Sequence, residues 1–268
     1  MLRFASLGSG SEGNGLLVEC RDGERRVRLL IDCGFGIREA RRRLDRLGLA
    51  AGDLDAILVT HEHGDHIGGV FRLAQDAAAP VYLTRGTLRH VPASGPSALN
   101  DARGEPRADV RLIDPGRIWE VGGVRIEPVA VPHDAGEPVQ YVIDDGGCRL
   151  GVLTDLGHAT AHVVRSFSRL DALMLESNHD SQMLADSDYP YSLKRRIAGP
   201  YGHLSNDAAA QMLARIDHDR LRSVTAAHLS QRNNEPELAC RALSRGWGVQ
   251  IDQIRLADQH QGVDWLDV

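Results

Sequence analysis

The sequence predicts an α/β fold, a sandwich of mixed β-sheets flanked by helices, from three observations. Short apolar runs rich in Val, Ile and Leu recur along the 268-residue chain, and such runs are typical of buried strands. Helical patterns lie between them, yet they are too few to supply one helix for every strand, which favours mixed sheets. No linker or low-complexity segment interrupts the chain, so we expect one domain over residues 1–268.

The individual elements follow from these patterns. The clearest candidate strands are VRLLID (27–32), LDAILVTH (54–61), VRIEPVAVPH (124–133), RLGVLTD (149–155), LDALMLES (170–177) and LRSVTAAH (221–228). The candidate helices are residues 36–49, with Ile37, Ala40, Leu44 and Leu47 spaced to lie on one face, residues 67–77, and residues 205–216, which open on a good N-capping residue.

Composition limits the classes of function. The chain has no apolar run of eighteen residues and no signal-peptide pattern at its start, so we expect a cytoplasmic protein without a membrane segment. Its four cysteines lie far apart and form no C-x-x-C pair, which argues against a disulfide framework and a cysteine-rich zinc site. The formal net charge of −6 is unusual for a nucleic-acid-binding module, although bound divalent cations would offset most of it.

Polar residues follow five of the predicted strands, at or just past the carboxyl end of each apolar run. They are Asp32, His61, His133, Asp155 and His228. Open α/β sheets usually bind their ligands at this edge, so side chains delivered by separate strands can converge there. We therefore expect these five side chains to lie close together.

The segment THEHGDHIGG, residues 60–69, is the densest cluster of candidate metal ligands. His61 and His63 are two residues apart in an extended loop, so both rings can bind one ion. Asp65 and His66 come after Gly64 and can turn toward a second ion. Imidazole and carboxylate suit zinc, manganese or iron, and two adjacent cations can clamp an in-line displacement at a phosphorus or acyl centre.

The motif His61-x-His63-x-Asp65-His66, with Asp32-x-Gly34 before it, resembles that of the metallo-β-lactamase superfamily, and the resemblance covers essentially the whole chain. It implies an αββα sandwich with two divalent metal ions, zinc or manganese, at one edge of the sheets. The implied ligands are His61, His63 and His133 for the first ion, Asp65, His66 and His228 for the second, and Asp155 between both, with Asp32 supporting the loop. A hydroxide that bridges the ions would be the nucleophile, and Asp65 would orient it.

The triplet His-Leu-Ser occurs twice, at 203–205 and 228–230. His228 ends a predicted strand and completes the implied second metal site, which leaves His203 free. We predict that His203 is the general acid that protonates the leaving oxygen, the alternative being a structural role in its loop. We also predict that substrate phosphate is bound by Ser205, Ser230, Asn233 and Arg196. The role of His179 is left open.

The segments GSGSEGN (8–14) and ESNHD (176–180), together with the two HLS segments, resemble the YycJ/WalJ-like branch of that superfamily. The branch implies 5′-to-3′ exonuclease action, so we predict a dinuclear phosphodiesterase, most simply a nuclease acting on DNA or RNA. The alternatives are a small-molecule cyclic phosphodiesterase, a thioesterase or lactonase of the same fold, and a metal-bound protein that binds or regulates. Choice of nucleic acid, native metal, mode of cleavage and oligomeric state stay open.

Overall fold

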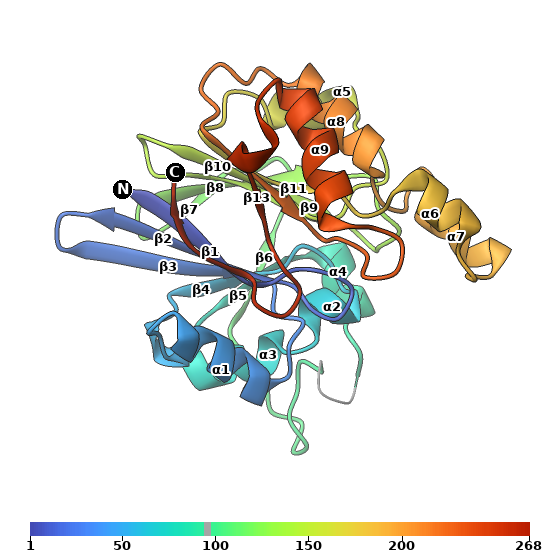
Figure 1. Ribbon diagram of the computed structural model, residues 1–268. Helices are drawn as coiled ribbons and strands as arrows, with labels where there is room; N and C mark the ends of the chain where they lie inside the picture. The colour runs from blue at the N-terminus through green and yellow to red at the C-terminus, as the bar shows by residue number, and fades with distance from the viewer. Residues whose placement is uncertain (94–97) are drawn as a thin grey trace.

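The apolar runs of the sequence form two face-to-face β-sheets, with helices on both outer faces, in the computed structural model of the chain (Figure 1). The structure describes residues 1–93 and 98–268. Within these ranges each sheet has seven strands, and each combines antiparallel and parallel pairs. The predicted sandwich of mixed sheets is confirmed. The prediction of one domain stays a prediction.

The strands of the two sheets follow a regular order in space. The first sheet is β14 (Val263–Asp267), β1 (Leu2–Gly8), β2 (Gly15–Asp22), β3 (Arg25–Ile31), β4 (Ala56–Leu58), β5 (Val81–Thr84) and β6 (Val110–Ile113). The second sheet is β13 (Ile254–Leu256), β12 (Ser223–Ala227), β11 (Ala172–Glu176), β10 (Arg149–Leu153), β9 (Val139–Asp144), β8 (Val124–Ala130) and β7 (Trp119–Val121).

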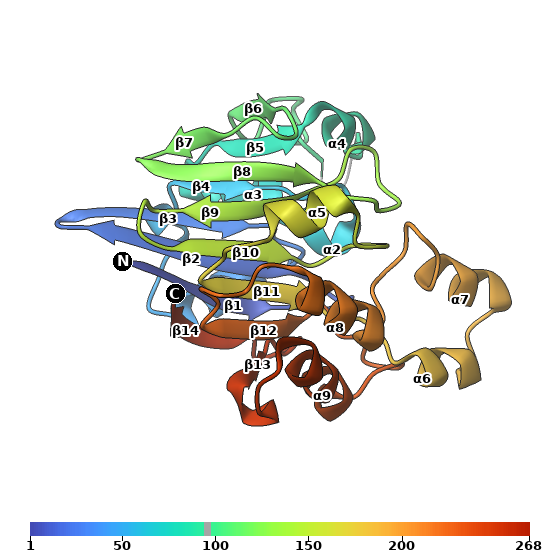
Figure 2. The ribbon, with the colours of Figure 1, turned by 90° about the horizontal axis from the view of Figure 1, so that it is seen from above.

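The helices fall into three groups. On the first sheet lie α1 (Ile37–Arg46), α2 (Gly64–Ile67), α3 (Val70–Ala77) and α4 (Arg85–His90), with a 3-10 turn at Ala51–Asp53. On the second sheet lie α5 (Ala161–Ser166), α8 (Asn206–Arg215) and α9 (Pro236–Trp247), with a 3-10 turn at Ile251–Gln253. The short helices α6 (Ser181–Asp186) and α7 (Tyr191–Ile197) project from the body of the molecule (Figure 2).

Alternation along the strands divides the core into layers. In β3, Leu29 and Ile31 point into the cluster between the two sheets, whereas Leu30 packs beneath α1 and α3. Successive strand residues face opposite sides, so one strand serves both layers. A third cluster packs α5, α8 and α9 on the second sheet. The sheets are thus fixed on both faces, and side chains at the strand ends project from a rigid frame.

The predicted helices agree with the structure. Residues 36–49 contain α1, residues 67–77 contain α3, and α8 begins after Ser205, whose hydroxyl accepts a hydrogen bond from the N–H of Ala208. Strand β4 covers three residues of its predicted run, and the remainder forms the loop that carries His61. In the described part of the chain, no helix is long and apolar enough to cross a membrane, and all four cysteines are free.

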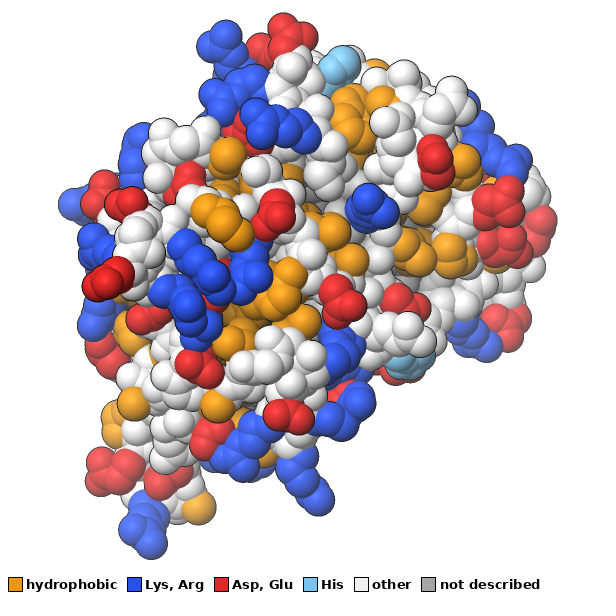
Figure 3. Space-filling view, turned by 60° about the vertical axis from the view of Figure 1, so that its left-hand side comes forward, with side chains coloured by type: hydrophobic (Ala, Val, Ile, Leu, Met, Phe, Trp, Pro, Cys, Tyr) orange, Lys and Arg blue, Asp and Glu red, His pale blue; other side chains and the backbone are white. Residues whose placement is uncertain are grey.

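Charged residues of both signs are interspersed on the face that carries the β2–β3 hairpin, and no broad basic surface is visible there (Figure 3). Glu19 of β2 is the centre of one such cluster. Its side chain is fully buried beneath guanidinium groups, accepting hydrogen bonds from Arg3, Arg21 and Arg28 at 2.6–2.8 Å. Burial alone would raise the pKa of Glu19, but these hydrogen bonds outweigh it and hold the pKa below its usual value.

We expect Glu19→Gln to lower the free energy of unfolding at pH 7 by about 1–2 kcal/mol, because charge-assisted hydrogen bonds are lost although the arginines are partly exposed. A carboxyl with a depressed folded-state pKa stabilises above its unfolded pKa and loses that contribution as the pH falls through the folded value. The difference between wild type and variant should therefore shrink in acid. Urea unfolding at pH 7 and at pH 4 measures this difference.

The matched control is Glu24→Gln, since Glu24 is exposed in the turn between β2 and β3. The control should change the stability by less than about 0.5 kcal/mol at either pH. A loss in Glu19→Gln that is equally large in acid would contradict the electrostatic origin of the effect.

Candidate metal centre

The residues that follow the strands converge at one edge of the two sheets, as the sequence predicted. Asp32 follows β3, His61 lies beyond β4, and Asp155 follows β10. His133 and His228 follow β8 and β12 of the second sheet. Asp32 and His228 have backbone φ angles of 60° and 53°, in the left-handed region that side chains seldom adopt. Such strain is found where the surrounding structure holds a residue for function.

Three histidines form a first donor group. His61, His63 and His133 each present a ring nitrogen within 4.8 Å of the others. The Nδ1 atom of His63 lies 3.0 Å from Nε2 of His61 and 3.2 Å from Nε2 of His133. Three imidazole nitrogens converging at these distances can bind one divalent cation.

The opposite ring nitrogens are held by the protein. Nδ1 of His61 lies 2.9 Å from the Thr60 hydroxyl, and Nδ1 of His133 donates to the Gly202 carbonyl at 3.0 Å. Nδ1 of His66 lies 2.9 Å from Asp32, which also accepts the Thr60 N–H and hydroxyl. Each contact fixes a ring orientation and leaves Nε2 free as the ligand atom. Asp32 therefore contacts His66 directly and is linked to His61 through the Thr60 hydroxyl.

A second donor group is formed by Asp65, His66 and His228, again with ligand atoms within 4.8 Å of one another. Asp155 lies between the groups. One of its oxygens is 3.1 Å from Nε2 of His66, and the other is 3.3 Å from Nδ1 of His228 and 3.8 Å from Nε2 of His133. A carboxylate in this position can contact two cations at once. The cluster therefore fits a dinuclear metal site.

Unpaired buried atoms support this fit. Among the described residues, Asp155 Oδ2 and both ring nitrogens of His228 are buried without a hydrogen bond of normal geometry, although such atoms are normally paired. Burial alone would lower the pKa of His228, but the Asp155 and Asp65 carboxylates raise it to about 10. A bound cation would occupy the same negative field in place of the histidine proton, so metal binding here should release protons.

A cavity of about 350 Å³ opens onto both donor groups. One wall carries His63, Asp65, Asp155 and His228. Helix α7 and the loop after it supply further lining residues, among them Arg196, which donates to Asp134 at 2.5 Å. Four of the candidate metal donors therefore line a recess that a substrate can enter.

The comparison with known proteins agrees with this geometry. A family model described as "Beta-lactamase superfamily domain" matches residues 27–224. The chain is 34% identical over 254 residues to exodeoxyribonuclease YycJ of Bacillus anthracis, covering 92% of each protein. It is 30% identical over 263 residues to exodeoxyribonuclease WalJ of Streptococcus pneumoniae, covering 98% of this chain and 92% of that protein. The chain belongs to the metallo-β-lactamase superfamily.

The architecture is shared with solved members of this fold. The structure of Zn(2+)-bound PqqB from Methylobacterium extorquens superposes with a TM-score of 0.70 at 17% identity, over 99% of this chain and 100% of that one. The αββα sandwich predicted from the motif is thereby confirmed. The chain is a metal-dependent hydrolase of the metallo-β-lactamase fold.

Beside the metal ligands of this metallo-β-lactamase fold lies a histidine–carboxylate pair. His203 lines the cavity, and its Nδ1 donates to Glu176 at 2.7 Å, while Asp155 is 3.5 Å away. Glu176 is fully buried at the end of β11 and also accepts the N–H groups of Leu156 and Leu204. Burial alone would lower the pKa of His203, but Glu176 and Asp155 raise it above its usual value.

Sequence reasoning assigned no role to Glu176 or to the GSGSEGN segment. Glu176 lies at the end of an apolar run, as Asp155 does. Its position at the carboxyl end of a predicted strand is the signal by which it could have been found. In the N-terminal segment, the amide nitrogen of Asn14 lies 3.3 Å from Asp65 Oδ2 and 3.1 Å from Nε2 of His66. Ser9 Oγ accepts the His228 N–H at 2.9 Å. This segment therefore contacts the whole second donor group.

The predicted phosphate-binding residues are not brought together. Arg196 lines the cavity, but Ser205, Ser230 and Asn233 are absent from the described residues that line it. The Ser205 and Ser230 hydroxyls instead accept backbone N–H groups at the starts of α8 and of the turn after His228. Asn233 is buried. His179, whose role was left open, is also buried, and burial lowers its pKa to about 4.

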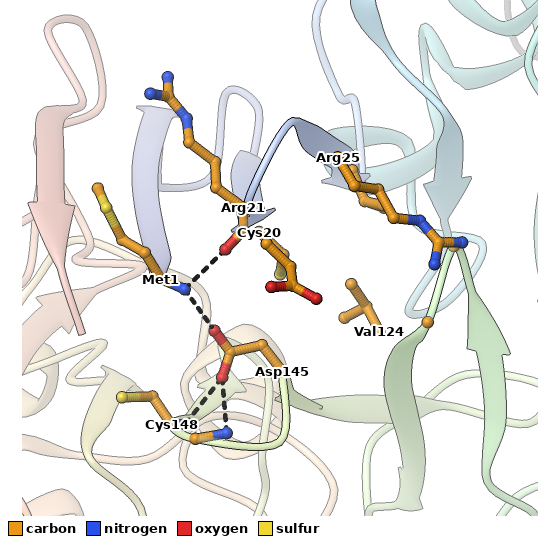
Figure 4. Close-up of a pocket in the computed structure, with 12 residues that line it drawn as sticks. Met1, Cys20, Arg21, Arg25, Val124, Asp145 and Cys148 are labelled. Carbon is orange, nitrogen blue, oxygen red and sulfur yellow. Dashed lines mark hydrogen bonds and ion pairs between the residues drawn. The ribbon is translucent and has the colours of Figure 1, made fainter.

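A larger cavity, of about 440 Å³, lies away from the metal donors (Figure 4). The amino group of Met1 donates to the Arg21 carbonyl and pairs with Asp145 there. Burial raises the pKa of the Cys20 thiol to about 12, and the pKa of Cys148 is also raised. Thiols held protonated in this way are poor nucleophiles. The cavity has the size of a binding site but not the chemistry of a catalytic one.

Proposed function

We propose that this chain is a dinuclear phosphodiesterase, a nuclease that degrades DNA in the 5′-to-3′ direction with zinc or manganese. The observation that carries the proposal is the His203–Glu176 pair beside the metal donors. Hydrolysis of a phosphodiester of DNA expels an alkoxide, which needs a proton, and a positioned histidine supplies one. The relatives named exodeoxyribonuclease support DNA as the substrate. The Zn(2+)-bound structure of PqqB supports zinc, one of the two candidate metals.

Separate residues of this chain would hold the two cations and orient the attacking water. His61, His63 and His133 would hold one cation, Asp65, His66 and His228 the other, and Asp155 both. When bound, the two cations would lower the pKa of water toward about 7 and offset the charge that develops on the phosphoryl oxygens. Asp65 lines the cavity and would orient the attacking water.

The His203–Glu176 pair would complete the reaction. Glu176 accepts the Nδ1 proton and so fixes the ring, which leaves Nε2 to deliver a proton to the leaving oxygen. Glu176 and Asp155 raise the pKa of His203 above its usual value, which favours the protonated ring. Arg196 would contact the substrate phosphate, with Asp134 holding the guanidinium at the cavity. Ser205, Ser230 and Asn233 stay predicted phosphate contacts that no observed contact supports.

The direct test uses purified protein with Mn²⁺ or Zn²⁺ and single-stranded DNA labelled at either end. A 5′-to-3′ exonuclease releases the 5′ label as a short product from the earliest times and shortens the 3′-labelled strand progressively. Double-stranded DNA, RNA, a thioester and a lactone are tested in parallel. Progressive shortening of the 5′-labelled strand would refute the direction. Hydrolysis of the thioester or lactone with intact DNA would refute the phosphodiesterase.

A further inference from the structure

One wall of the metal cavity is formed by helix α7. Leu193, Arg196 and Ile197 of α7 line the cavity at positions i, i+3 and i+4, which lie on one helix face. No residue of α7 is buried, and the helix projects from the body of the molecule together with α6 (Figure 2). The face toward the cavity is therefore not explained by core packing.

Two members of this face do not fit the chemistry of the cavity. Leu193 and Ile197 are the two aliphatic side chains among the described residues that line it, and the others are polar, charged or glycine. Neither can hold a cation, move a proton or contact a phosphate. Apolar surface facing water-filled space is unfavourable unless something apolar covers it. Leu193 and Ile197 are half-buried, and an uncharged part of a substrate would cover their remaining exposed surface.

The wall is attached directly to the histidine that would protonate the leaving oxygen. The backbone N–H of His203 donates to the carbonyl of Ile197 at 2.8 Å. Gly202 lies so close to the end of α7 that a Cβ there would come within 2.2 Å of the Arg196 and Ile197 carbonyl oxygens. The positions of Leu193 and Ile197 relative to His203 are therefore fixed. A group bonded to the oxygen that His203 would protonate would therefore lie beside this wall.

The wall combines the two kinds of contact that a nucleotide requires. Arg196 offers a guanidinium to phosphate, while Leu193 and Ile197, one turn apart, offer an aliphatic surface to a sugar and base. A base reaches this recess only when it is unpaired, since a paired base is stacked within the duplex. The charge and the apolar surface together fit a single strand.

We propose that Leu193 and Ile197 form a subsite for the sugar and base of the nucleotide that carries the leaving oxygen, in single-stranded DNA. This subsite rests on the proposed nuclease function and names the part of the substrate that the helix recognises. It makes α7 a specificity element, distinct from the residues that hold the cations or transfer the proton.

The test is a double-mutant cycle between protein and substrate. Leu193→Ala/Ile197→Ala is compared with wild type on 5′-phosphorylated single strands that are intact or carry one abasic residue at position 1, 2 or 6. On intact DNA we expect kcat/KM of the variant to fall roughly 10- to 50-fold. An abasic residue at the leaving nucleotide, position 1 or 2, should slow wild type by a similar factor and slow the variant no further.

The control is Ile251→Ala, an exposed isoleucine on another surface, which should cleave all strands as wild type does. Circular dichroism and metal content should be unchanged in the double variant, since α7 buries no residue. If every abasic residue slows both enzymes equally, the subsite is wrong although the nuclease stands. If wild type cleaves none of the strands, the proposed function itself is wrong and the subsite with it.

Discussion

Replacing Asp155 with alanine is expected to abolish DNA cleavage, with a loss on the order of 10³-fold or more. Asp155 lies within 3.1–3.8 Å of His66, His133 and His228, which places its carboxylate between the two donor groups. Without it, neither group has a ligand in common with the other. We expect elemental analysis to find fewer than two metal ions per chain in the variant and two in wild type.

The loss must be separated from simple unfolding. Asp155→Asn keeps the shape of the side chain and should behave like the alanine variant in metal content and rate, because an amide is a much weaker ligand than a carboxylate. The control Asp144→Ala removes an acid from the end of β9, where Asp144 pairs with Arg125, and should keep both ions. EDTA should lower the melting temperature of wild type more than that of either Asp155 variant. Full metal occupancy in Asp155→Asn would contradict the bridging role.

Replacing His203 with alanine is expected to slow DNA cleavage by roughly 10²- to 10⁴-fold while both metal ions stay bound. His203 is the proposed proton donor, paired with Glu176, and it is not a member of any donor group that contains His61 or His66. The loss should depend on the leaving group. Bis-p-nitrophenyl phosphate expels a stable phenolate that needs no proton, so the variant should cleave this ester nearly as fast as wild type.

The pH dependence gives a second measure of the same pair. An acid works while protonated, so wild-type activity on DNA should fall as the pH rises through the pKa of His203, which Glu176 holds above its usual value. Glu176→Gln keeps an oxygen near Nδ1 but removes the charge, and should shift this fall to lower pH. His162→Ala, at an exposed histidine of α5, should change neither profile. If His203→Ala slowed the cleavage of DNA and of bis-p-nitrophenyl phosphate by the same factor, the role of His203 would be structural.

Sequence reasoning reached the metal donors because their signal is local. His61 and His63 are neighbours in one loop, and Asp32, His133, Asp155 and His228 each follow an apolar run whose end could be placed from composition alone. The direction of each strand then puts these residues at a common edge. The branch resemblance also agrees with relatives that are 30–34% identical over more than 90% of the chain.

Other parts of the site depend on contacts between segments that have no local signature. Glu176 pairs with His203 because β11 places it 2.7 Å from that histidine, which lies 27 residues later in the chain. Ser205 has the chemistry to bind phosphate, but its hydroxyl is used by the first turn of α8. Asn14 reaches the second donor group only after the first sheet brings the N-terminal segment against α2.

The class of fold and the set of candidate metal ligands could be predicted from residue order, because the alternation of apolar residues and the polar residues at strand ends are local patterns. Three features could be seen only in the tertiary structure. They are the ring nitrogen of each histidine that is available to a metal ion, the carboxylate that pairs with His203, and the side chains of α7 that line the cavity. These features depend on distances between residues that are far apart in the chain. Ligand chemistry is decided by separations of about 3 Å between atoms that are tens to hundreds of residues apart, and only packing of the two sheets fixes those separations.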